Sequence, residues 1–150
     1  MLKALQKDGM EIGSHGWDHV FLTRLDPAAL KHQLEDSKKK LENLLQKEVP
    51  FFSIPRGRYN EGVLEAIRKA GYRLVLTSDI GMNRQGTNPF RIRRWSMKRS
   101  YTLSDFASII EGHAKRYLVF EHLLKQSAYR LFGHTLYERA RNTLLKEEKR

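Results

Sequence analysis

Two histidines, His15 and His19, are the residues of this 150-residue sequence whose types and spacing most directly suggest chemistry. They stand four positions apart in the segment SHGWDH. Neutral imidazole nitrogens bind zinc at about 2.0 to 2.1 Å, and two histidines at this spacing can share one ion. The same spacing fits two histidines that are simply hydrogen-bonded in a loop. Gly16, Trp17 and Asp18 stand between them, which excludes the HExxH pattern of zincin metalloproteases.

The residues around this segment predict how it is positioned. A helix is expected to end at Gly9, and residues 10–12 are expected to form a short strand that leads into a glycine-rich loop with the histidines. A longer helix is predicted over 27–46, because Asp26 is a favourable N-cap and Pro27 suits the first helical position. Its leucines recur at helical spacing, so one face of this helix should contact a core.

The following segments alternate between strand and helix. Apolar runs predict strands over 51–54 and 72–77, with a helix over 60–70 between them. This alternation is typical of a parallel α/β fold. Glycines, asparagines and a proline predict a loop over 79–90, and the weak alternation of 90–97 predicts one more strand at a sheet edge.

The remainder of the chain reads as helices that begin near Ser104. We therefore divide the sequence into an α/β domain over 1–100 and a C-terminal helical extension or cap over 101–150. The sequence has no cysteine, which excludes disulfides, thiolate metal sites and cysteine nucleophiles.

Two segments of this sequence resemble the polysaccharide deacetylase family, carbohydrate esterase family four. The first is EIGSHGWDHVFLTRL, in which His15 and His19 match the family's metal-binding H-x-x-x-H motif and Glu11 begins the E-I-G-[SN] step before it. The second is FFSIPRGRYNEGVLEAIRKAGY, in which residues 53–57 match the R-x-P-[YF]-G motif. The resemblance covers about residues 2–97.

This resemblance implies an α/β fold, a partial distorted (β/α) barrel with a C-terminal helical extension, and a site at the carboxyl ends of the strands. It also implies a metal-dependent hydrolase that removes N-acetyl groups from the amino sugars of a bacterial surface glycan. The cofactor would be a divalent metal, zinc, on His15 and His19. The partner would be an acetylated amino-sugar polysaccharide or oligosaccharide.

The resemblance assigns expected roles to further residues. The backbone amide of Arg56 would contact the oxyanion of the reaction. Pro55, Gly57, Tyr59 and Asp79 would contact the substrate.

The sequence also departs from the family pattern. The family's metal-binding and base aspartates lie upstream of the histidines, and this sequence holds only Asp8 and Glu11 there. We therefore expect that the chain is truncated at its N-terminus and that its activity is impaired. Ser53 replaces the arginine of the proline motif. Asp18 or water would have to complete a metal shell.

The formal charge of +11 favours anionic partners. The alternative function is therefore a non-catalytic basic module that binds an anionic glycan or a membrane surface. Residues 114–150 contain nine basic and four acidic residues, and they are compatible with a peripheral membrane contact or with a helical cap. No nucleic-acid-binding motif is present. Since no export signal is visible, we expect a cytoplasmic location or one at the inner membrane surface.

Overall fold

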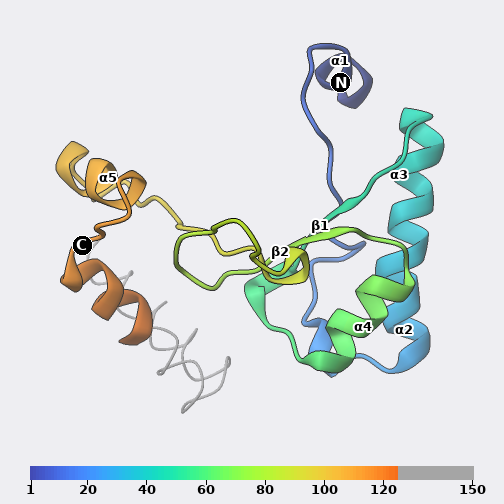
Figure 1. Ribbon diagram of the computed structural model, residues 1–150. Helices are drawn as coiled ribbons and strands as arrows, with labels where there is room; N and C mark the ends of the chain where they lie inside the picture. Colours follow the sequence, from blue (N-terminus) through green and yellow to red (C-terminus); the bar gives the residue numbers. More distant parts are fainter. Residues whose placement is uncertain (125–150) are drawn as a thin grey trace, which may run out of the picture. The chain divides into compact units, whose positions relative to one another are not determined.

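The computed structural model describes residues 1–124, and the chain divides into two compact units, Met1–Ser96 and Met97–Arg150. Within these residues, no helix is both long and apolar enough to cross a bilayer. The regular elements of the first unit are α1 (Leu2–Lys7), α2 (Pro27–Lys31), α3 (Ser37–Leu45), β1 (Phe51–Ser53), α4 (Glu61–Lys69) and β2 (Leu74–Leu76) (Figure 1). Short 3₁₀ turns lie at Leu22–Arg24, Pro55–Gly57 and Pro89–Arg91.

The sheet is parallel, as the sequence predicted. Strands β1 and β2 pair with Phe52 opposite Val75, and α4 connects them. Two single bridges extend this pair on its two sides, because Ser14 pairs with Phe52 and Ile92 pairs with Leu76, both in parallel. The four extended segments therefore lie side by side in the order in which they occur in the sequence.

Two predicted strands are wrong. Residues 10–12 have no regular secondary structure. Ser14 bonds to β1 instead, through its amide to the carbonyl of Phe51 and through its carbonyl to the amide of Ser53. The segment 90–97 begins inside the Pro89–Arg91 turn, and only Ile92 bridges to β2. Each segment pairs over too short a length to form a ladder.

The core of the first unit lies between the strands and the helices α2, α3 and α4. Leu34, which lies between α2 and α3, is buried, and so are Phe52 of β1 and Val75 of β2. Helix α4 contributes Ile67, and Val63 and Leu64 beside it are also buried, since these three positions share one face of the helix. Figure 1 shows α4 lying beside the rod that α2 and α3 form.

A π turn at His32–Asp36 interrupts the helix that the sequence predicted as a single one over 27–46. The hydroxyl of Tyr72 donates to the carbonyl of Leu34 at 3.0 Å, and the hydroxyl of Ser37 lies 3.2 Å from the same carbonyl. Side chains that contact helix carbonyls in this way disturb the regular ladder. Leu44 is half exposed, because it lies about 100° around the helix from its buried neighbour Leu45.

Side-chain caps start the helices α2 and α4, and we expect each cap to stabilise the fold by about 1 kcal/mol. Asp26 accepts from the amide of Ala29 at 2.8 Å, and Asn60 accepts from the amide of Val63 at 2.9 Å. Chemical denaturation of Asp26→Ala and Asn60→Ala should show this loss. Asp26→Asn and Asn60→Asp keep an acceptor oxygen and serve as controls; equal losses in all four variants would contradict a capping role.

The second unit contains α5 (Leu103–Ile110) and a further helical segment over 116–124. Thr102 and Asp105 form a reciprocal capping box at the start of α5, two residues before the predicted cap Ser104. The Lys115 ammonium, together with the hydroxyl of Tyr117, holds the pKa of the Asp105 carboxyl well below its usual range. The part of the 114–150 segment beyond residue 124, for which we expected a cap or a membrane contact, lies outside the described residues.

Candidate functional site

The candidate site lies where the four parallel segments end. His15 follows Ser14, Ser53 ends β1, Ser78 follows β2 closely, and Arg94 follows Ile92. Because the carboxyl ends of parallel strands meet at one edge of a sheet, these residues come together. They line a cavity of about 510 Å³, to which Arg56 also contributes.

The two histidines meet at this edge. The ring centroids of His15 and His19 are 5.0 Å apart and the ring planes are inclined by 47°. Both side chains are exposed to solvent. His19 has a left-handed backbone, with φ of +52°, an uncommon conformation that histidine adopts more readily than most residues. The structure therefore places close together the two histidines whose spacing the sequence analysis singled out.

The hydrogen bond of His15 determines which of its nitrogens is available. Its Nδ1 lies 2.7 Å from the carbonyl oxygen of Ser53. A carbonyl can only accept, so Nδ1 carries the proton and the lone pair of the neutral ring is on Nε2. Histidines that bind metals usually donate their other N–H to a carbonyl or carboxylate in this way. Nε2 of His15 is therefore an atom that could bind a divalent ion such as zinc.

The described part of the chain offers no third protein ligand arranged with the pair. Within residues 1–124, no group of three or more His, Cys, Asp or Glu side chains is arranged to hold a metal ion. Asp18, the carboxylate nearest in sequence, accepts a hydrogen bond from Nε2 of Gln33 at 2.9 Å. Two imidazoles are therefore the protein ligands that this part of the chain offers.

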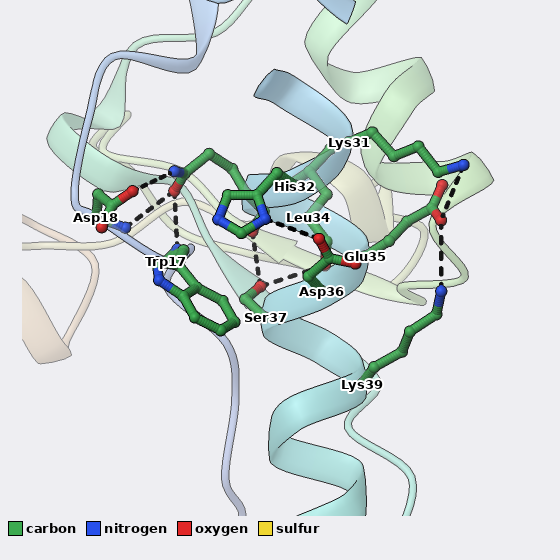
Figure 2. Close-up of polar contacts among 10 residues, drawn as sticks. Trp17, Asp18, Lys31, His32, Leu34, Glu35, Asp36, Ser37 and Lys39 are labelled. Carbon is green, nitrogen blue, oxygen red and sulfur yellow. Dashed lines mark hydrogen bonds and ion pairs between the residues drawn. The ribbon is translucent and has the colours of Figure 1, made fainter. Parts of the chain in front are cut away.

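The loop between the histidines is fastened to the π turn (Figure 2). Oε1 of the buried Gln33 accepts from the amides of Trp17 and Asp18, at 2.8 and 3.0 Å. At the start of the loop, the buried Ser14 and Ser37 hydroxyls lie 3.0 Å apart. Since Ser37 donates its proton to the carbonyl of Gln33 at 2.6 Å, Ser14 is the donor in the pair.

The outer side of this loop packs on the same helix. The ring of Trp17 lies 4.9 Å from that of His32, and the ammonium of Lys40 lies 4.3 Å from the Trp17 ring centroid. His32 in turn bonds Asp36 through Nδ1 at 2.7 Å (Figure 2). These contacts restrict how far the loop can move relative to the π turn.

The turn Pro55–Gly57, which we call the proline turn, lies against the loop that carries His15 and His19. Pro55 is buried, and Arg56 and Gly57 both have left-handed backbones, with φ of +56° and +66°. Nε of Arg56 donates to the carbonyl of His19 at 3.2 Å, and its guanidinium lies 4.9 Å from the Phe21 ring centroid. Of the residues assigned to this turn by resemblance, Arg56 lines the cavity with His15.

Tyr59 and Asp79 are brought together, but they do not line the cavity of His15. The Tyr59 hydroxyl donates a hydrogen bond to the carboxylate of Asp79. Burial, together with this hydrogen bond, raises the pKa of Tyr59 to about 12, so the phenol stays protonated at neutral pH. Asp79 lines a second cavity in the loop after β2.

Sequence reasoning missed three residues of this region. Gln33 reads as an ordinary helix residue, and its burial depends on the loop that folds over it. Ser78 and Arg94 follow segments that pair in the sheet, and only this pairing brings them to His15. A correct prediction that residues 76 and 92 pair would have placed both Ser78 and Arg94 near His15.

Comparison with known proteins finds relatives that are named as deacetylases of polysaccharides or peptidoglycan. The sequence model of the polysaccharide deacetylase family matches residues 1–75, half of the chain. The Bacillus subtilis protein YxkH, named as a polysaccharide deacetylase, is 31% identical over 111 residues, which are 74% of this chain and 40% of YxkH. A peptidoglycan-N-acetylglucosamine deacetylase of Bacillus cereus is 33% identical over 59% of this chain and 41% of its own length. The chain thus spans about two fifths of these relatives.

Solved structures show a similar fold. The Streptococcus pyogenes deacetylase PplD, solved with acetate, aligns with a TM-score of 0.67 at 21% identity, over 72% of this chain and 48% of that one. A polysaccharide deacetylase of Bacillus cereus aligns with a TM-score of 0.66 at 24% identity, over 73% of this chain and 35% of its own. Together with the family match, which includes both histidines, these likenesses show that the chain belongs to the polysaccharide deacetylase family.

Proposed function

We propose that this chain supplies the histidine ligands of a metal-dependent hydrolase that removes N-acetyl groups from the amino sugars of a bacterial surface glycan. The observation that carries the proposal is the arrangement of His15 and His19. Their rings are 5.0 Å apart, and the bond from His15 to Ser53 leaves Nε2 of His15 as a ligand atom. His15 and His19 would hold a divalent ion, which we take to be zinc.

The chemistry expected at this position is amide hydrolysis. A bound divalent ion supplies a Lewis acid for the acetamide carbonyl and lowers the pKa of a bound water. Arg56 lies in the same cavity as His15, which supports a role for its backbone amide as a donor to the oxyanion. Pro55 and Gly57 fix the turn that carries Arg56, and Gly57 packs closely on Ser78 of the cavity wall.

The order of the extended segments supports the barrel architecture that we propose for the first unit. In a (β/α) barrel each strand lies beside the next strand of the sequence and is joined to it by a helix. Here Ser14, β1, β2 and Ile92 follow one another without a reversal of order, and α4 joins β1 to β2. A doubly wound sheet would reverse its order at one point.

Titration with zinc tests the metal site. We expect the 150-residue chain to bind one zinc ion, weakly for a structural site because two protein ligands are present. Isothermal titration calorimetry of His15→Ala and His19→Ala should show a loss of affinity of about a hundredfold, and the double variant should not bind detectably.

His113→Ala removes a histidine of the second unit and serves as the matched control, with unchanged binding expected. Zinc binding that persists in the double variant would reject the histidine pair as the metal site. Circular dichroism of each variant shows whether the fold is intact.

A further inference from the structure

A second cavity, which we name the arginine cavity, lies in the loop that follows β2. Its volume is about 610 Å³, and its walls include Arg84, Arg91 and Arg93 and a single acid, Asp79. The lining residues therefore include three arginines and one acid, an excess of positive charge. This excess of positive charge is local, so it is distinct from the basic residues that are spread along the whole chain.

The acids of this region are already engaged. Asp79 accepts the hydrogen bond of the Tyr59 hydroxyl, and Arg91 forms an ion pair with Glu61. Neither Arg84 nor Arg93 has an acidic partner among the described residues. Two guanidinium groups in the wall of this cavity are thus available to a ligand.

The loop holds these two arginines in fixed places. The amide of Arg84 donates to Oγ1 of Thr87 at 2.8 Å, and the amide of Thr87 donates back to the carbonyl of Arg84 at 2.9 Å. Asn83 bonds both the amide and the carbonyl of Arg93, at 3.0 and 2.9 Å. These side-chain bonds fasten the loop backbone at both arginines, so the backbone needs little reordering on binding.

Gly81 leaves room for the Arg93 side chain. A Cβ at position 81 would lie 2.9 Å from Cδ of Arg93, closer than carbon atoms normally approach. The residue also has φ of +140°, a conformation that side chains disfavour. Glycine at position 81 therefore allows the Arg93 side chain to lie close to the loop backbone.

The arginine cavity adjoins the cavity of the histidine pair. Ser78 and Arg94 line the histidine cavity, whereas their neighbours Asp79 and Arg93 line the arginine cavity. The two segments are held together, since the amide of Arg94 donates to the carbonyl of Asp79 at 2.8 Å. The two cavities are therefore lined by neighbouring residues of the same two segments.

We propose that the arginine cavity binds an oxyanion, a carboxylate or phosphate group, that the acetylated glycan carries beside its reacting amino sugar. The proposal rests on the proposed function and specifies its substrate as an anionic glycan. Guanidinium groups present a planar fork of donors that matches the oxygen atoms of both anions. Tyr59 keeps Asp79 occupied, which reduces the repulsion between that carboxylate and the ligand.

Binding of small anions tests this proposal without any turnover. The full chain is dialysed against a chelator and then against chelator-free buffer, so that metal binding has no influence. It is then titrated with sodium glucuronate, with inorganic phosphate and with neutral N-acetylglucosamine. We expect one of the two anions, or both, to bind, and the tighter one identifies the charged group. The double variant Arg84→Gln/Arg93→Gln should bind at least about tenfold more weakly, because each charge-assisted bond contributes strongly to affinity.

The control removes the same charge elsewhere. Lys69→Gln/Arg73→Gln changes two exposed basic residues whose ion pairs are with Glu65 and Glu48, outside the cavity, and should alter the affinity by less than about twofold. An equal loss in both double variants, or neutral sugar binding as tight as anion binding, would overturn the arginine cavity. Zinc binding that persists in the double histidine variant, with anion binding retained, would reject the metal site alone.

Discussion

Gln33→Ala is expected to lower the free energy of unfolding by roughly 2 to 3 kcal/mol, a large effect for one polar side chain. The buried amide of Gln33 accepts from two backbone amides of the histidine loop and donates to the Asp18 carboxylate. Alanine leaves these groups without their partner and creates a cavity beneath the loop. Thermal and urea unfolding measure the change.

The same variant should weaken zinc binding by about tenfold, because partners that orient metal ligands commonly have effects of that size. Gln33 touches neither histidine; it fixes Trp17 and Asp18 between them. Glu35→Ala is the matched control on the same turn, since its ion pairs with Lys31 and Lys39 are on the surface (Figure 2). The control should cost less than about 1 kcal/mol. A Gln33→Ala variant with normal stability and normal zinc affinity would contradict the positioning role.

Local signals were sufficient to predict most of the regular structure. The Asp26-Pro27 start and the start of a helix near residue 60 are encoded in a few adjacent residues, and the structure confirms both. The apolar runs around Phe52 and Val75 were also read correctly, because buried parallel strands are apolar on both faces. Helix ends and central strands are thus properties of short segments.

Features that depend on distant partners were not predicted. The π turn depends on Tyr72, which lies 38 residues after Leu34 in the chain. The strands expected at 10–12 and 90–97 lack paired neighbours over most of their length. The arginine cavity likewise needs the pairing of Ile92 with Leu76 before its arginines lie together. In each instance the deciding contact joins residues remote in sequence.

The histidine pair was predictable from the sequence in its spacing but not in its geometry. The spacing of His15 and His19 was evident in the sequence, and the family resemblance gave it a meaning. Sequence reasoning left open whether the two rings meet, since a loop with a different path would separate them. The anchoring of that loop by Gln33 and Ser37 answers the question in physical terms.

The second large effect is expected for Gly57→Ala, which should cost roughly 2 to 5 kcal/mol. Gly57 has φ of +66°, so any side chain there adopts the disfavoured left-handed conformation. In addition, a Cβ at this position would overlap the Cβ and Oγ of Ser78, whereas the Cα of Ser78 lies at an ordinary 3.6 Å. The contact joins the proline turn to the wall of the histidine cavity, so its disturbance should also move Arg56.

Two further variants separate the causes of this loss. Gly86 has a similar φ of +85° but nothing within 4 Å of an added Cβ, so Gly86→Ala should show only the conformational cost of about 1 to 2 kcal/mol. In a Ser78→Gly background the overlapping atoms are gone, so Gly57→Ala should then cost about as much as Gly86→Ala. Urea unfolding of the unchanged chain, the two single variants at positions 57 and 78 and the double variant gives the coupling free energy between the two residues. The same cost for Gly57→Ala in both backgrounds would show that the two residues do not pack as closely as the structure has them, and the turn would then be free to shift away from His15.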